Sequence, residues 1–202
     1  MYKLLFITTG PSGAGKNTVM NHIRRTFPTV TKAVTYTTRA PRPNEVDGID
    51  YRFVTDEEFF AKVDSGDIME YEQVYNDYYY GSPADIFTDG DIKVMEMDWQ
   101  GHRTYRQFYK NIRIVSIFLV PPSFEEIKKR ILKRSAVSNL DSRIANAMEQ
   151  LEHAGEYSFV ILNRHKEKAL QEVESIIRTE LLRRQRNRSL AYAQKIIRQH
   201  KK

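Results

Sequence analysis

The sequence contains no cysteine, and this absence excludes several kinds of chemistry at once. A chain without thiols has no disulfide framework, no thiolate metal centre and no cysteine nucleophile. The lack of cysteine also fits a reducing compartment, so we expect a cytoplasmic protein. The five histidines have no metal-ligand spacing, and we assign no metal site to them.

Long apolar runs are also missing, and none approaches the roughly 20 residues that a membrane-spanning helix needs. The apolar stretch within MYKLLFITTG is short and is followed by Gly, Pro and Ser, so it predicts a buried strand rather than a signal peptide. We therefore expect no membrane partner. Apolar residues still make up 41% of the 202 residues, which is enough for a sizeable core.

Acidic residues are absent from one end of the chain. Residues 181–202 contain eight lysines and arginines and no aspartate or glutamate, whereas the other 180 residues carry 24 basic and 26 acidic groups. The formal net charge of +6 therefore comes from the C-terminal tail, residues 183–202. Such a tail is most often a solvated helix, and a weak contact with nucleic acid or an acidic partner is the alternative.

Apolar runs alternate with helical patterns over most of the chain. Consecutive apolar residues predict buried strands at 3–8, 92–97, 112–120 and 159–162. Helical spacing predicts helices at 18–27, 124–132, 140–153 and 166–182, and a weak apolar stripe extends the last one toward residue 200. This alternation predicts an α/β fold with a parallel sheet and right-handed crossovers.

Two segments break this alternation. Residues 33–85 are rich in Thr, Tyr, Asp, Pro and Gly and predict an inserted lobe of short strands and turns. Residues 134–146 are polar and carry no strand pattern, so we expect them to form a helical flap over the site.

The segment GPSGAGKN, residues 10–17, lies between the first predicted strand and the first predicted helix. It matches the phosphate-binding pattern G-x-x-x-x-G-K, in which glycines let backbone N–H groups point at phosphates and the lysine adds a cation. The positive end of the following helix adds to the attraction. We expect the loop to bind ATP through Gly10, Pro11, Ser12, Gly13, Ala14, Gly15, Lys16, Asn17 and Thr18.

The last position of this pattern is unusual. Asn17 stands where a serine or threonine hydroxyl normally ligates Mg²⁺. An amide oxygen can reach the ion, and Mg²⁺ also retains water readily. We therefore expect Mg²⁺ to accompany ATP, held mainly by phosphates and waters with a weak contribution from Asn17.

Four further segments indicate the phosphate acceptor. They are TYTTRAPRPNEVDGIDYRFV (35–54), EYEQVYNDYYYGSP (70–83), EMDWQG (96–101) and VPPSFEEIKKR (120–130). Over about residues 4–180 they closely resemble the guanylate kinase family, in that family's order and spacing. The resemblance implies transfer of the γ-phosphoryl group of ATP to GMP, and to dGMP, in purine nucleotide metabolism.

The resemblance also implies an architecture. It is a P-loop NTPase fold with a three-layer α/β core around a parallel sheet, covering residues 1–34, 85–133 and 147–182. An inserted mixed α/β GMP-binding lobe covers residues 35–84. A small helical lid covers residues 134–146.

Individual roles follow from the same resemblance. The residues that bind GMP are Thr35, Arg39, Arg42, Tyr51, Glu70, Tyr80 and Asp98. Those around the transferring phosphoryl group are Lys16, Arg39, Arg130, Arg134 and Arg143, and Glu96 lies near the water shell of Mg²⁺. We name no general base, because phosphoryl transfer depends mainly on positioning and on neutralising charge.

The residue types suit these ligands. Forked guanidinium groups match a phosphate dianion, and tyrosine hydroxyls add neutral donors. Guanine presents its N1–H and 2-amino donors along one edge, where the carboxylate of Glu70 can accept from both. Adenine presents a bare acceptor at N1, which would leave a buried carboxylate unpaired at a cost of a few kcal/mol.

Other interpretations stay open. Asn17 and Tyr36 depart from the residues usual in the family, so a kinase for a different monophosphate is one alternative. A non-catalytic guanylate kinase-like binding module is another, against which the intact phosphate loop argues. Glu96 at the sheet edge and Arg130 on a charged helix could have plain structural roles. The oligomeric state is undecided, with a homodimer among the options.

Overall fold

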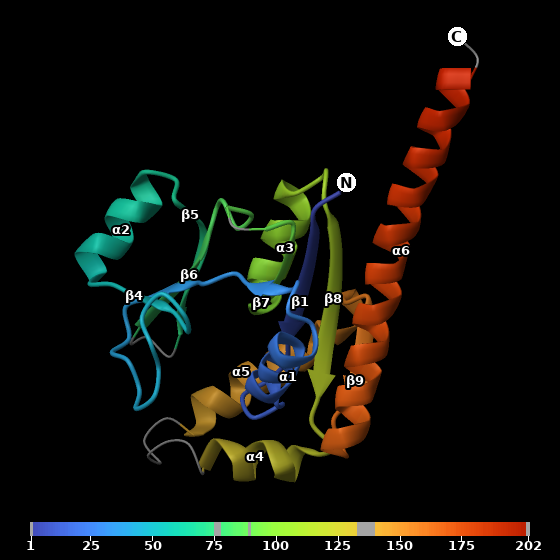
Figure 1. The fold of residues 1–202 in the computed structure, drawn as a ribbon. Helices are drawn as coiled ribbons and strands as arrows, with labels where there is room; N and C mark the ends of the chain where they lie inside the picture. The colour runs from blue at the N-terminus through green and yellow to red at the C-terminus, as the bar shows by residue number, and fades with distance from the viewer. Residues whose placement is uncertain (1, 75–77, 89, 133–139, 201–202) are drawn as a thin grey trace.

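A five-stranded parallel sheet forms the centre of the computed structural model, which describes residues 2–74, 78–88, 90–132 and 140–200. Its strand order is β2-β7-β1-β8-β9 (Figure 1). The strands are β1 (Leu4–Thr9), β2 (Thr31–Lys32), β7 (Ile92–Glu96), β8 (Arg113–Val120) and β9 (Phe159–Leu162). Since all pairings are parallel, the carboxyl ends of the strands share one edge of the sheet.

Strand β1 is buried on both faces, which explains its unbroken apolar sequence. Leu4 and Phe6 belong to one core, with residues of α1 (Lys16–Thr26) and α6 (Lys166–His200). Leu5 and Ile7 belong to a second core, with Tyr105 of α3 (Trp99–Phe108). Side chains alternate across a strand, so helices must cover both faces and the core has three layers.

A second sheet lies beside the first and has the strand order β4-β3-β6-β5. Its strands are β3 (Tyr36–Thr37), β4 (Arg52–Phe53), β5 (Ile68–Val74) and β6 (Tyr78–Pro83), and α2 (Asp56–Asp64) packs on it. Thr55 and Glu58 form a reciprocal capping box that starts α2. Tyr36, Phe59 and Ile68 form the small core of this lobe.

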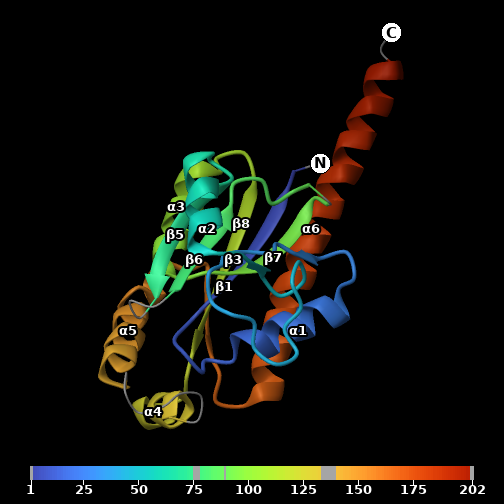
Figure 2. The same cartoon turned by 90° about the vertical axis from the view of Figure 1, so that its left-hand side faces the viewer.

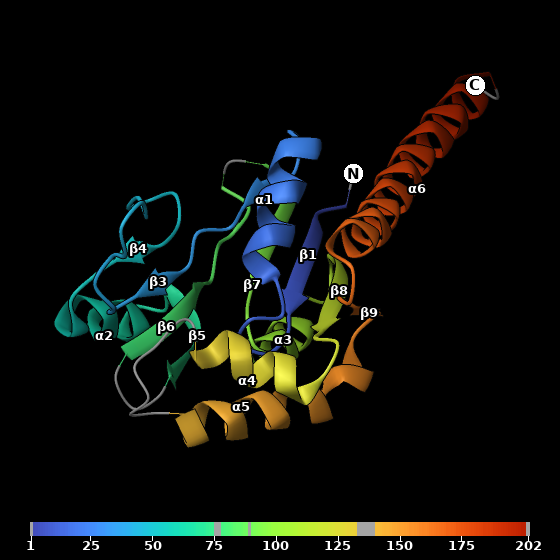
Figure 3. The same ribbon diagram turned by 90° about the horizontal axis from the view of Figure 1, so that it is seen from below.

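Helices α4 (Phe124–Leu132) and α5 (Leu140–Glu152) lie against each other below the carboxyl edge of the central sheet (Figures 1 and 3). Ile127 and Ile131 of α4 pack with Ala147 of α5. A short 3₁₀ helix (Ala154–Glu156) connects α5 to β9. Within the described residues, no helix combines the length and the apolar character needed to cross a membrane.

The four predicted strands and four predicted helices are all present, with ends shifted by two residues at most apart from the extension of α6 to His200. The sequence did not predict β2, α2 or α3. Strand β2 has two residues, and α3 buries only Gly101, His102 and Tyr105. Residues 134–139 of the predicted flap lie outside the described part of the chain, and residues 140–146 belong to α5.

Helix α6 is fixed to the body by a buried carboxylate. Glu180 is 1% exposed and accepts hydrogen bonds from Nη2 of Arg113 at 3.0 Å and Nη1 of Arg183 at 2.7 Å. Arg184 then donates to the backbone oxygen of Tyr2 and to Asp91. Beyond this point the helix extends past the rest of the molecule (Figure 2).

We predict that Glu180→Gln lowers the free energy of unfolding by about 1–2 kcal/mol, because a buried acceptor loses its charge between two arginines. Glu172→Gln, an exposed carboxylate on the same helix, is the control and should leave it nearly unchanged. Urea denaturation measures both. Equal effects of the two changes would contradict an anchoring role for Glu180.

Candidate functional site

The loop between β1 and α1 folds as the sequence predicts. Gly13 and Gly15 have φ values of 82° and 100°, a region that favours glycine, and α1 begins directly at Lys16. A side chain at Gly13 would meet Cβ of Arg130 at 2.6 Å, and one at Gly15 would meet Nδ2 of Asn163 at 2.5 Å. Both glycines are therefore required by close neighbours as well as by backbone conformation.

Lys16 is held at the carboxyl edge of the central sheet. Its Nζ donates to the carbonyl oxygen of Gly10 at 2.6 Å and lies 3.5 Å from Oε1 of Glu96. Glu96 ends β7, and its backbone pairs with Thr8 of β1. The adjacency of two parallel strands thus places Glu96 beside Lys16, and its role near the water shell of Mg²⁺ stays a prediction.

Two residues outside the loop hold its backbone. Nη1 of Arg130 donates to the carbonyl oxygen of Gly13 at 2.6 Å, while its Nε donates to Glu126 at 2.6 Å. Nδ2 of Asn163, just after β9, donates to the carbonyl oxygen of Ala14 at 2.7 Å. Arg130 therefore has more than a plain solvent-facing role. Asn163 was missed by sequence reasoning, and its position after a parallel strand was the available signal.

The other predicted arginines and Thr18 are placed differently. Arg143 is half-buried on α5, the helix that packs against the helix carrying Arg130. Arg134 lies outside the described residues. Thr18 is exposed on α1 and lines a surface hollow with Lys166 and Leu170, and it is not among the residues that line the cavity around Glu96.

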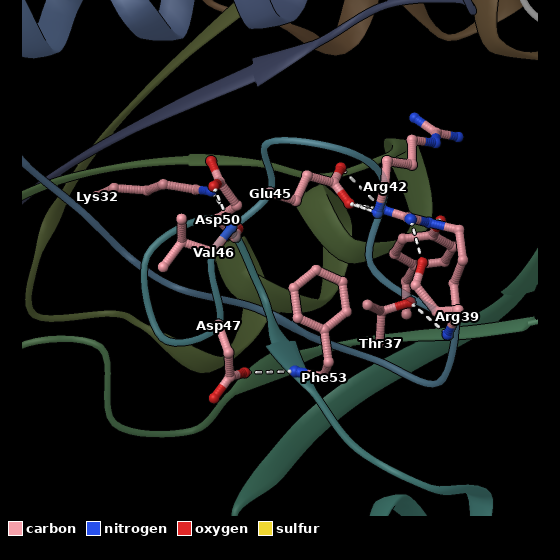
Figure 4. Close-up of polar contacts among 11 residues, drawn as sticks. Lys32, Thr37, Arg39, Arg42, Glu45, Val46, Asp47, Asp50 and Phe53 are labelled. Carbon is pink, nitrogen blue, oxygen red and sulfur yellow. Dashed lines mark hydrogen bonds and ion pairs between the residues drawn. The ribbon is translucent and has the colours of Figure 1, made fainter.

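Arg39 is buried, being 8% exposed, and its donors are engaged. Its Nε donates to the hydroxyl of Tyr80 at 3.0 Å, and its Nη2 donates to Oε2 of Glu45 at 2.9 Å. Glu45 also accepts from the backbone N–H of Arg42 at 2.8 Å, whereas the side chain of Arg42 points away from this network (Figure 4). Sequence reasoning missed Glu45.

Tyr51 packs between these groups. Its ring centroid lies 5.9 Å from that of Tyr80 and 5.6 Å from the guanidinium carbon of Arg39. Burial, together with the negative charge of Glu96, raises the pKa of the Tyr51 hydroxyl well above its usual value. The hydroxyl therefore stays protonated and can donate a hydrogen bond to an anion.

A second group of polar residues surrounds the first turn of α3. Asp98 caps this helix, and its Oδ1 accepts from the N–H of Gly101 at 2.9 Å. Both carboxylate oxygens of Glu70 lie 3.0 Å from the place where a Cβ on Gly101 would be, so the helix closely approaches Glu70. Burial raises the pKa of Glu70 to about 7. The negative charge of Asp98 adds to this rise in pKa, whereas a hydrogen bond with Ser82 opposes it.

Glu72 joins this group, although sequence reasoning missed it. Burial, a hydrogen bond with Asp98 and the negative charges of Asp98 and Glu70 all raise the pKa of Glu72. Glu70 and Glu72 are two residues apart on β5 and so share a face of the sheet. That spacing was the signal from which Glu72 could have been found.

Residues of the phosphate-binding segment and of the connections beside β3 and β4 meet in one cavity of about 130 Å³. Of the predicted site residues, its lining contains Asn17, Thr35, Tyr51 and Glu96, and it also contains Glu45 and Lys32. Tyr36 does not line it, because its ring is buried in the core of the lobe beside Phe59 and Ile68. The departure at position 36 therefore affects packing in the lobe rather than the cavity wall.

The cavity offers few ligands for a cation. No group of three or more His, Cys, Asp or Glu side chains within the described ranges could hold a metal ion. Asn17 and Glu96 supply one amide and one carboxylate to the same cavity. Oxygen donors of this kind suit Mg²⁺ when phosphates and waters complete the coordination.

Taken together, the phosphate loop after β1, the lysine at its end and a second lobe beside the same cavity define a P-loop phosphotransferase. Comparison with known proteins specifies the family. The family model described as guanylate kinase matches residues 2–180. The chain therefore belongs to the guanylate kinase family, and both the predicted family and the predicted α/β P-loop fold class are confirmed.

Individual relatives agree with this assignment. The guanylate kinase of Cereibacter sphaeroides is 37% identical over 193 residues, covering 93% of this chain and 91% of that protein. That of Methylobacillus flagellatus is 36% identical over 187 residues, covering 90% and 92%. The crystal structure of guanylate kinase from Anaplasma phagocytophilum matches with a TM-score of 0.70 at 29% identity, covering 89% of this chain and 86% of that one.

The carboxyl cluster of Glu70, Glu72 and Asp98 leads to a prediction about pH. The folded-state pKa of Glu70 lies above its ordinary value of 4.5, so the folded state binds the proton more tightly than the unfolded state. The resulting stabilisation is complete below that ordinary value and is lost as the pH rises through about 7. We expect the free energy of unfolding without nucleotide to fall by on the order of 1–3 kcal/mol from about pH 5 to about pH 8.

Thermal unfolding across this pH range measures the effect. Glu70→Gln should flatten the decline, and Glu72→Gln should do so at the alkaline end. Glu167→Gln, an exposed carboxylate on α6, is the matched control and should leave the decline unchanged. A decline that survives both substitutions in the cluster would show that the cluster is not its source.

Proposed function

We propose that this protein transfers the γ-phosphoryl group of ATP to GMP, giving ADP and GDP, and that it also accepts dGMP. The observation that carries the proposal is the shared cavity, in which Asn17 of the phosphate loop and Glu96 face Thr35 and Tyr51 of the second lobe. Two nucleotides bound on these two sides would bring their phosphates together, which is the main requirement of phosphoryl transfer.

Glu70 and Asp98 select guanine in this proposal, with Thr35 reading the other edge of the base. The first turn of α3 approaches Glu70 closely, so a base placed here would be held between β5 and the helix. Ionised Glu70 would accept the N1–H and 2-amino hydrogens of guanine. A pKa of about 7 leaves a substantial ionised fraction near neutral pH, and the two donors of guanine favour that form further.

The acceptor phosphate is bound by Arg39, Arg42, Tyr51 and Tyr80. Arg39 is already fixed by Tyr80 and Glu45, and a phosphate dianion would compete with Glu45 for its Nη2. The side chain of Arg42 points away from that network and can turn toward an anion (Figure 4). Glu45 thereby keeps the buried guanidinium in position and lowers the cost of holding a charge there.

The donor side relies on the phosphate loop. Its backbone N–H groups and Lys16 hold the β- and γ-phosphates, while Arg130 steadies the loop at Gly13 and lies next to the path of the transferring group. We assign Arg134 and Arg143 of the lid, residues 134–146, to the transferring phosphoryl group. The chain thus consists of a core (1–34, 85–133 and 147–182), a GMP-binding lobe (35–84), this lid and the tail (183–202).

Mg²⁺ accompanies ATP in this account. The amide oxygen of Asn17 would contact the ion directly, and the carboxylate of Glu96 would contact it through water. When bound, the ion neutralises charge on the phosphate oxygens. ATP and GMP are cytoplasmic metabolites, so we place the protein in the cytoplasm.

Turnover with a panel of acceptors tests the proposal. Purified protein receives ATP, Mg²⁺ and GMP, dGMP, AMP, UMP or CMP, and ADP release is followed. We expect turnover with GMP and dGMP and at most a trace with the others. Rapid turnover with AMP and none with GMP would refute guanine selection, and folded protein that is silent with all five would favour a non-catalytic binding module.

Glu70→Gln tests the base contact separately. The amide retains one acceptor and adds a donor that faces the donors of guanine, so kcat/KM for GMP should fall by about 10²-fold or more. The KM for ATP should change little, because Glu70 is assigned to the base of GMP and not to the phosphates of ATP. Glu57→Gln, on the exposed side of α2, is the control and should behave as the wild type. A parallel loss of ATP binding would contradict the assigned role.

A further inference from the structure

The nucleotide-binding fold does not account for the presence of the C-terminal part of α6. The family match ends at residue 180, yet α6 continues without a break to His200. Every residue from 185 to 200 is exposed, and Figures 1 and 2 show this part of the helix extending beyond the body. A helix of this length, about 24 Å, that packs on nothing is only marginally stable in water.

The projecting helix has two different faces. Successive residues turn by about 100°, so positions three, four and seven apart lie on one side. The apolar side carries five large exposed residues, with exposed fractions between 45% and 67%: Leu182, Leu190, Tyr192, Ile196 and Ile197. The opposite side carries Arg184, Arg188, Lys195 and Arg198. Arg186 and His200 also lie on the apolar side, so that side is mixed. The helix is still amphipathic, because the opposite side carries cations and no large apolar residue.

The apolar side also points away from the protein body. Val173, Ile177 and Glu180 are the buried face of α6, and the same face continues along the helix through Arg184, Arg188 and Lys195. Leu182 and Ile196 lie about half a turn from that face. A flat surface that contacted the apolar side would therefore meet the helix without colliding with the rest of the molecule.

The charge of this segment restricts what can cover it. Residues 181–202 contain eight basic residues and no acidic ones. Arg184 is paired with Asp91 of the body, but Lys195 and Arg198 are three residues apart on a segment without acidic residues, so their like charges repel along the helix. Pairing with the tail of a second copy would double this charge, which argues against self-association. An anionic surface would remove the repulsion.

Amphipathic character distinguishes between anionic surfaces. A nucleic acid would use the cations and leave Ile196, Ile197 and Leu190 in water. A bilayer takes up both features, because apolar side chains enter the boundary between headgroups and acyl chains while long basic side chains reach the lipid phosphates. We propose that residues 182–200 form a peripheral helix that lies on a bilayer surface rich in anionic lipid.

This proposal revises the expectation of no membrane partner. That expectation concerned spanning segments, and a surface-bound helix needs only an apolar face. Electrostatic attraction decays within about 10 Å at moderate salt, so binding should depend on both ionic strength and lipid charge.

Vesicle flotation with the full chain tests the proposal. The vesicles contain either phosphatidylcholine alone or phosphatidylcholine with phosphatidylglycerol. We expect flotation only with the anionic vesicles, and loss of flotation at high salt.

The double variant Ile196→Gln with Ile197→Gln should weaken binding by about tenfold or more. The matched control is Ala191→Gln, on the basic side, which should bind as the wild type. GMP turnover should be the same in all of these proteins and reports correct folding.

Three results would overturn the proposal. One is the absence of flotation with anionic vesicles. Another is undiminished flotation of the double isoleucine variant, which would mean that charge alone is responsible. The third is tight binding to a labelled RNA duplex, or a dimer in sedimentation equilibrium that the double variant abolishes, with no vesicle binding. Vesicle binding is measured without nucleotide, so its outcome is independent of whether GMP is the acceptor.

Discussion

The contact of the Lys16 ammonium with the carbonyl of Gly10 and the carboxylate of Glu96 organises the nucleotide site. It exists because β1 and β7 are neighbouring parallel strands, so the loop after one strand and the last residue of the other meet at the same edge. Arg130 and Asn163 then hold the loop from outside, through Gly13 and Ala14. The ammonium group of Lys16, the N-terminus of α1 and the fixed backbone of the phosphate loop therefore lie together at this edge of the sheet.

The side of the site that receives GMP depends on the same edge of the central sheet. The second sheet is inserted between β2 and β7, and its position brings Thr35 and Tyr51 to the cavity that Asn17 and Glu96 line. Two kinds of electrostatic environment result within the same lobe. Around Arg39, a cation is satisfied by Glu45 and Tyr80, whereas around Glu70 three carboxyl groups crowd together and favour protonation. The first environment suits an anion, and the second suits a ligand that donates hydrogen bonds.

Much of this arrangement was predictable from sequence because its signals are local. The strand at residues 4–9, the glycine loop and the long helix from residue 166 each follow from apolar periodicity or loop chemistry within a short window. Features that arise from contacts between distant segments were not predictable in this way. Glu45 holds Arg39, Asn163 holds the loop, and Tyr36 packs in the core of the lobe only because the fold brings these residues together. Helix α2 was missed because its apolar periodicity is weak, and α3 was missed because Tyr105 is its only fully buried large apolar side chain.

The central claim is that the chain has two separate nucleotide sites, with Lys16 serving ATP and Glu70 serving guanine. Calorimetric titration of ATP with Mg²⁺, and of GMP, into Lys16→Met and Glu70→Gln tests it most directly. The account predicts that Lys16→Met loses ATP binding and retains GMP binding, while Glu70→Gln shows the reverse. Loss of both ligands in either folded variant, or a loss of GMP binding confined to Lys16→Met, would contradict it.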